Sequence, residues 1–209
     1  MRQIVLFLFI LLAFSSFAQS YPFMEDFVNG AVILKDSSSK SGQVKWFPSQ
    51  DQKLKFRETE KGKTIKYSPE EVAGFTVDTF KFSSVSNFEA YAGDYTLLGK
   101  TSHIKHTFGQ VLGTGKFNVY LVMILGYNAI SGGMQTYPNF LFQNSRDSSL
   151  APVAYPVAIR MKDKKYERAK EDLYILFKEY PAIVDKLKKY RQEDNFFEII
   201  NMVKAVNLE

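Results

Sequence analysis

The sequence contains no cysteine, one tryptophan and only two histidines among its 209 residues. Because there are no disulfides, the stability of the protein must come from a packed core. The apolar run from Ile4 to Phe14 is shorter than the roughly 20 residues that a membrane-spanning helix needs, and Ser15 and Ser16 follow it directly. The chain has no cysteine pair and no His-Glu-x-x-His motif, two common signatures of a zinc site.

The first 18 residues have the pattern of a secretory signal peptide. Arg2 precedes the apolar run, and the small-x-small exit Ser16-Phe17-Ala18 follows it. We predict cleavage after Ala18, which makes Gln19 the first residue of the mature protein. The alternative, an anchor that stays in the membrane, is disfavoured because the run is short. Lipid attachment through cysteine is excluded.

The composition is that of a folded, β-rich protein. Hydrophobic residues make up 45% of the chain and aromatic residues 15%, with 19 Phe and 12 Tyr. Aromatic side chains favour the half-buried surfaces of sheets. An exported chain without cysteine fits the envelope of a Gram-negative bacterium. We therefore expect the protein in the periplasm, at the cell surface or outside the cell.

Residues 30–82 predict short strands separated by turns, in an antiparallel meander. Leu54 and Phe56 alternate with charged residues and should point inward. Ser68–Val72 has the composition of one helical turn, with Ser68 as its cap. Phe75 and Phe82 fall on opposite parities, which predicts a bulge or tight turn near Asp78-Thr79.

The middle of the chain is harder to interpret. Residues 83–101 are expected to form a loop, and residues 126–138 a turn. Phe117–Leu125 is almost continuously apolar, which favours a strand buried on both faces. Residues 139–143 have the pattern of another strand. Pro152 and Pro156 predict that 153–159 is an extended edge segment.

The character of the sequence changes at Asp163, where helical periodicity begins. One helix should stop before Pro181, a second should open at Pro181, and Asp194 should cap a third. The expected fold class is α+β: an antiparallel meander or roll with two or three C-terminal helices packed on it. The expected divisions are a signal peptide (1–18), a β-rich region (19–160) and a helical region (161–209), the last two forming one compact unit.

Several segments resemble an uncharacterised family of exported proteins from Gram-negative bacteria. They are Gly30-Ala-Val-Ile-Leu-Lys-Asp, Gly42-Gln-Val-Lys-Trp, Leu54-Lys-Phe, Ile65-Lys-Tyr-Ser-Pro-Glu-Glu-Val-Ala-Gly-Phe and Tyr174-Ile-Leu-Phe-Lys-Glu-Tyr-Pro. The resemblance covers roughly residues 28–80 and 165–205. It implies a leader peptide, a strand-rich front half and a charged helical tail, but no established activity.

No motif assigns a catalytic residue, a metal or a cofactor. His103 and His106 lie in a strand pattern, which places them on opposite faces and disfavours a shared metal. Residues 109–116 are rich in glycine but lack the spacing of a phosphate loop and are expected to form a hairpin. Glu70 and Glu71 suit a first helical turn better than an acid–base pair.

Two features indicate binding. The first is a basic stretch, residues 160–191, with eleven Lys or Arg against six acids, which predicts a solvated helix face or weak contact with an anionic surface. The second is a set of tyrosines near predicted loops and strand ends, although core packing is the simpler reading for any one of them. These are Tyr91, Tyr95, Tyr120, Tyr127, Tyr137 and Tyr155.

The leading hypothesis is therefore a non-enzymatic envelope protein that binds another envelope protein or a glycan, and not nucleic acid. The alternative is an exported hydrolase with an unrecognised site at His106 or Glu71. The sequence does not decide between them.

Overall fold

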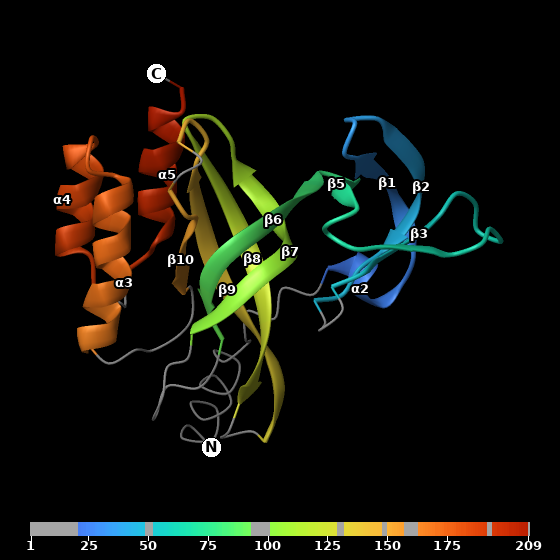
Figure 1. Ribbon diagram of the computed structural model, residues 1–209, viewed down its shortest axis with the longest axis horizontal. Helices are drawn as coiled ribbons and strands as arrows, with labels where there is room; N and C mark the ends of the chain where they lie inside the picture. Colours follow the sequence, from blue (N-terminus) through green and yellow to red (C-terminus); the bar gives the residue numbers. More distant parts are fainter. Residues whose placement is uncertain are drawn as a thin grey trace, which may run out of the picture.

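The computed structural model describes residues 21–48, 52–92, 101–128, 132–147, 150–156, 163–191 and 194–208. It confirms the α+β class, with an antiparallel sheet in the N-terminal two thirds followed by three helices (Figure 1). None of the helices in this described part is long and apolar enough to cross a membrane.

The sheet has ten described strands in the order β10-β9-β8-β7-β6-β5-β1-β2-β3-β4. Their bounds are β1 (Val28–Leu34), β2 (Ser39–Lys45), β3 (Leu54–Arg57), β4 (Ile65–Tyr67), β5 (Val72–Val77), β6 (Phe80–Tyr91), β7 (Thr101–Gly113), β8 (Phe117–Asn128), β9 (Gly133–Asn144) and β10 (Val153–Pro156). The described helices are α2 (Pro22–Glu25), α3 (Asp163–Leu176), α4 (Pro181–Lys189) and α5 (Phe197–Val206). We call β1–β5 with α2 the front unit, β6–β10 the roll, and α3–α5 the helical layer.

The front unit packs around a cluster of aromatic side chains. Val77 pairs directly with Phe80, so Asp78 and Thr79 form a two-residue hairpin turn, with Asp78 at φ +50°. This turn places Phe75 opposite Phe82, and their rings stack at 4.5 Å with 4° between the planes. The predicted tight turn is therefore confirmed, and it restores one apolar face to both strands.

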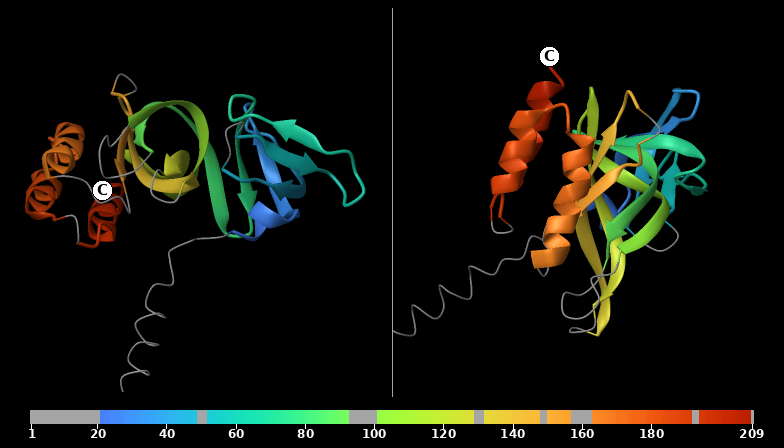
Figure 2. Two further views of the ribbon diagram at one scale, coloured as in Figure 1. Left: turned by 90° about the horizontal axis from the view of Figure 1, so that it is seen from below. Right: turned by 60° about the vertical axis from the view of Figure 1, so that its left-hand side comes forward.

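The strands of the roll curl round until β10 lies beside β6, as the left view of Figure 2 shows. Apolar side chains from several strands fill the interior, among them Val85, Phe88, Val122 and Leu141. Asn139 on β9 is fully buried. Its Oδ1 accepts from the Tyr91 backbone N–H at 3.0 Å, and its Nδ2 donates to the Tyr91 carbonyl at 2.9 Å. This amide thus satisfies the backbone N–H and carbonyl of Tyr91, at the end of β6 where the roll closes.

The helical layer covers the outer face of β8–β10 (Figures 1 and 2). Alternate residues of β8 point to opposite faces, Val119 toward the helices and Val122 into the roll. The prediction of a strand buried on both faces is confirmed. Tyr155 and Phe196 stack at 4.1 Å with 9° between their planes, which joins β10 to the residue just before α5.

The end of α5 is held against the turn between β7 and β8. Asn207 Oδ1 accepts from the Phe117 N–H at 2.9 Å, and its Nδ2 donates to the Phe117 carbonyl at 2.8 Å. A Cβ at Gly115 would lie 2.6 Å from the Asn207 side chain, and Gly115 has φ +150°. Glycine is therefore required at this position by both space and conformation.

Four local predictions are wrong. Residues 83–91 are not a loop, because β6 runs unbroken to Tyr91. The turn expected over 126–138 is shorter, since β8 continues to Asn128 and β9 starts at Gly133. Ser68–Val72 forms no helix, because residues 69–71 are a turn and β5 begins at Val72. Asp194 does not cap α5, because its carboxylate accepts from the Arg191 N–H at 2.7 Å.

Candidate functional site

A groove of about 560 Å³ lies between α3 and the edge of the roll where β10 meets β6. Its walls come from three parts of the chain that are far apart in sequence: β6 and the start of β7, residues 150–154, and one side of α3. This volume is within the usual range for small-molecule and peptide side-chain sites, about 300–1,000 Å³. Its lining residues are Glu89, Tyr91, Thr101, Leu150, Ala151, Pro152, Val153, Ala154, Arg168, Asp172, Ile175 and Leu176.

Local geometry explains why these side chains converge. On α3, Arg168, Asp172 and Ile175 are spaced by four and three residues, so they lie along one face of the helix. On β6, Glu89 and Tyr91 are two residues apart and therefore share a face of the sheet. The groove combines these polar groups with the apolar side chains that line it.

Two of the three charged side chains that line the groove are acidic. Glu89 Oε1 lies 3.0 Å from Nδ1 of His103, the residue on β7 that pairs directly with Glu89. Arg168 and Asp172 form no ion pair or hydrogen bond with any other described residue. Two carboxylates and one guanidinium therefore face a groove in a chain whose overall charge is +5.

Tyr91 is half-buried in the wall of the groove. Burial raises the pKa of its hydroxyl, the Asp172 carboxylate raises it further, and Arg168 acts in the opposite direction. The phenol therefore stays protonated at neutral pH. A neutral Tyr91 hydroxyl adds a hydrogen-bonding group that can both donate and accept.

The groove contains no arrangement typical of catalysis among its described residues. Thr101 and Tyr91 supply its hydroxyls, and neither has a histidine as a hydrogen-bond partner there. No three His, Cys, Asp or Glu side chains in the described ranges gather closely enough to hold a metal ion. The geometry supports holding a ligand more directly than activating a nucleophile.

The residues of the hydrolase alternative lie elsewhere. His106 Nε2 is 3.0 Å from Glu70 Oε1, with the two side chains 36% and 62% exposed. Glu71 turns away from this pair, because its Oε2 accepts from the Ser68 N–H at 2.6 Å. Hydrogen bonds from Ser68 hold the pKa of the Glu71 carboxyl below its usual range. His103 is exposed and His106 is half-buried.

The glycine-rich segment 109–116 is a hairpin, as predicted. Gly109–Gly113 belongs to β7, and Phe117 begins β8. A strand conformation presents its backbone N–H groups to neighbouring strands, so it does not cradle a phosphate.

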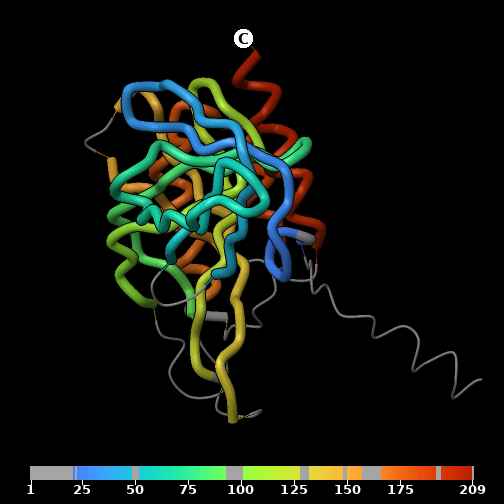
Figure 3. Tube along the Cα trace, turned by 90° about the vertical axis from the view of Figure 1, so that its right-hand side faces the viewer, coloured from blue at the N-terminus to red at the C-terminus, as the bar shows by residue number. Residues whose placement is uncertain are grey.

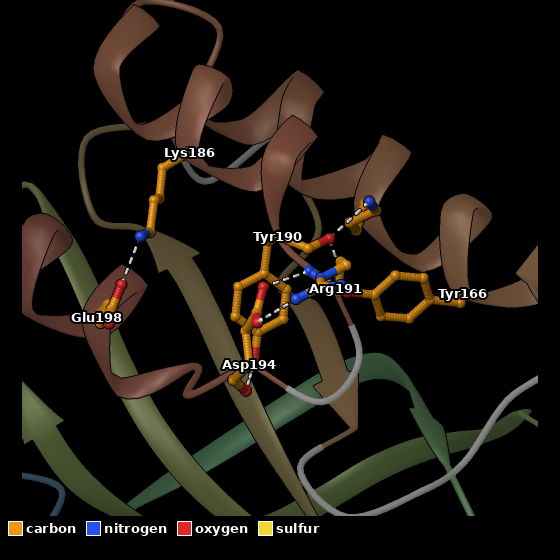
Figure 4. Close-up of polar contacts among 7 residues, drawn as sticks. Tyr166, Lys186, Tyr190, Arg191, Asp194 and Glu198 are labelled. Atoms are coloured by element: carbon orange, nitrogen blue, oxygen red, sulfur yellow. Dashed lines mark hydrogen bonds and ion pairs between the residues drawn. The ribbon is translucent and has the colours of Figure 1, made fainter.

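The basic stretch 160–191 is described from residue 163, in α3, α4 and the residues after each helix. Among the cations whose side chains are described, four have acidic partners. Lys186 Nζ reaches Glu198 Oε2 at 2.5 Å, as Figure 4 shows. Lys170, Lys188 and Arg191 lie 2.8 Å from Glu167, 3.7 Å from Asp185 and 4.0 Å from Asp194, respectively.

Lys170 is only 2% exposed, and its surroundings show a structural role. Its Nζ donates to the Tyr190 carbonyl at 3.2 Å, and the Tyr166 hydroxyl donates to the same oxygen at 3.1 Å. Figure 4 shows Tyr190 between Tyr166 and Asp194. Because this carbonyl follows the end of α4, Lys170 and Tyr166 bind α3 to the end of the next helix.

The six tyrosines considered as ligand contacts differ in their burial. Tyr120, Tyr137 and Tyr155 are buried, at 7%, 6% and 3% exposure, so they pack in the core. Tyr127 is 59% exposed, and Tyr95 lies outside the described residues. Of the five that the structure describes, Tyr91 alone lines the groove. Glu89 and Asp172 carried no recognisable sequence signal, because their proximity arises from the closure of the roll.

Comparisons with protein-family models, with curated proteins and with solved structures gave no match. The site is therefore interpreted from its geometry and chemistry alone.

Proposed function

We propose that this chain is an exported binding protein of the Gram-negative envelope and that the groove beside α3 holds its ligand. The observation that carries the proposal is the convergence of Glu89, Arg168 and Asp172 on a groove with apolar walls. Apolar walls with a few placed polar groups are typical of ligand sites. The N-terminal leader pattern supports the location.

The charges of the groove favour a ligand with a cationic group on an apolar body. Asp172 has no partner among the described residues, and the Glu89 carboxylate has only the exposed His103. A ligand ammonium or guanidinium placed between these carboxylates would form charge-assisted hydrogen bonds. Leu150, Val153 and Ile175 would then cover its apolar part. A peptide segment with a lysine or arginine next to apolar residues has this chemistry.

Calorimetric titration with matched short peptides tests the groove. The probes are one peptide with a central arginine flanked by leucines and a second with glutamate in place of the arginine. We expect the basic peptide to bind and Asp172→Asn to weaken it by roughly 10- to 100-fold, the effect of losing a hydrogen bond to a charged group.

Glu171→Gln is the matched control, because it removes the same charge from the neighbouring position on α3 and does not line the groove. Equal weakening by Glu171→Gln and Asp172→Asn, or tighter binding of the acidic peptide, would contradict the proposal.

The proposed export has its own test. Mass spectrometry of protein recovered from the envelope fraction should show a chain that starts at Gln19, with or without cyclisation of that residue. Exported material that retains Met1 would show that the leader is not removed.

A further inference from the structure

A row of three lysines crosses the sheet of the front unit. Lys45 on β2 pairs directly with Lys55 on β3, and Lys55 pairs directly with Lys66 on β4. Directly paired residues project from the same face of a sheet. With strands spaced by 4.7–4.9 Å, the row spans about 9–10 Å from first to last lysine.

A fourth cation lies beside this row, farther along β3. Arg57 follows Lys55 by two residues on β3, so it projects from the same face about 7 Å along the strand. Its Nε donates to Gln43 Oε1 at 2.8 Å, and its guanidinium lies 4.2 Å from the centre of the Phe27 ring. We call Lys45, Lys55, Arg57 and Lys66 the lysine face.

The charges of the lysine face have no carboxylate partner within the described residues. Lys45 Nζ donates to the backbone carbonyl of Glu25, and Lys55 and Lys66 form no hydrogen bond or ion pair there. Like charges directly opposite on neighbouring strands destabilise a sheet. An external layer of negative charge would relieve this repulsion.

The other side of the same strands fixes the direction of the lysine face. Val44, Leu54 and Phe56 alternate with the cations and are fully buried in the front core. The cations must therefore project outward. Figure 1 shows the front unit at the opposite end of the molecule from α3–α5, and Figure 3 looks onto that end, so this face is separate from the groove and from the basic helices.

We propose that the lysine face docks the protein on an anionic phospholipid bilayer. Its charges spread along and across three strands, which matches a surface of phosphates better than a single linear polyanion. Lysines near an anionic bilayer each contribute about 1 kcal/mol, or roughly fivefold in affinity. Phe47, two residues after Lys45, is 52% exposed and adds an aromatic side chain of the kind that partitions to membrane interfaces.

Vesicle co-sedimentation of the mature chain tests this proposal. The probes are vesicles of phosphatidylcholine alone and vesicles in which about one third of the lipid is phosphatidylglycerol. We expect binding to the anionic vesicles only, and a steep loss of that binding as salt is added. The double variant Lys55→Gln/Lys66→Gln should bind about 30-fold more weakly, at roughly fivefold for each lysine.

The matched control is Lys178→Gln/Lys189→Gln, which removes two exposed lysines, one just after α3 and one in α4, that have no partner among the described residues, and it changes the net charge equally. It should keep most of the binding. Circular dichroism checks that both variants fold.

Three outcomes would overturn the proposal: no binding to anionic vesicles at low salt, an equal loss in the control variant, or binding to heparin without binding to the vesicles. The second would assign the contact to net charge or to the basic helices. The third would assign it to a soluble acidic polymer.

Discussion

Residues 160–191 hold eleven basic and six acidic side chains, and residues 35–66 hold nine and four, so each stretch has an excess of five positive charges. Among the described side chains of 160–191, four cations have acidic partners, and two of these pairs lie within α3 or α4 at a spacing of three residues. On the lysine face, none of the four cations has one among the described residues. The two stretches therefore have the same net charge, but their cations lie in different electrostatic environments.

The secondary structure explains the difference. In a helix, residues three or four apart are neighbours, so interspersed acids reach the cations beside them. In a strand, alternate residues share a face, and the sequence Lys53-Leu-Lys-Phe-Arg57 places cations on one face and apolar residues on the other. The pairing of β2, β3 and β4 then brings lysines from separate segments into one row.

Among substitutions of these cations, we expect the largest loss of stability at Lys170, the buried cation of the helical layer. Lys170→Met removes a charged hydrogen bond to the Tyr190 carbonyl and the ion pair with Glu167. We expect the free energy of unfolding to fall by about 1–3 kcal/mol. Urea denaturation measures it.

Lys178→Met is the control for this prediction, because Lys178 is exposed and has no partner among the described residues. Its effect should stay within about 0.5 kcal/mol. If both variants lost the same stability, the contacts of Lys170 would contribute nothing beyond those of a surface lysine.

Local patterns predicted much of the fold. Alternation identified the short strands of the front unit, and the parity change between Phe75 and Phe82 located the hairpin turn. Helical periodicity placed α3 and α4. The failures were long-range. Residues 83–91 of β6 were missed because their mixed polar and apolar side chains carry no clear pattern, and their backbone gains its hydrogen bonds from β7 and from Asn139, neither of which is local in sequence.

The functional surfaces were less accessible to sequence reasoning. Composition drew attention to residues 160–191, where four described cations have acidic partners, and away from the front unit. The row of lysines depends on strand register, which a linear sequence does not reveal. The groove depends on the closure of the roll and the docking of α3, so Glu89 and Asp172 had no motif to identify them.

The smallest predicted effect tests the central claim most directly. A double-mutant cycle of Lys55→Gln and Lys66→Gln, followed by urea denaturation, measures the coupling between two directly paired lysines. At about 0.01 M salt the coupling should be repulsive, at roughly 0.2–1 kcal/mol. At about 1 M salt it should disappear, because the screening length falls to about 3 Å. Zero or attractive coupling at low salt would contradict the conclusion that the lysine face is uncompensated.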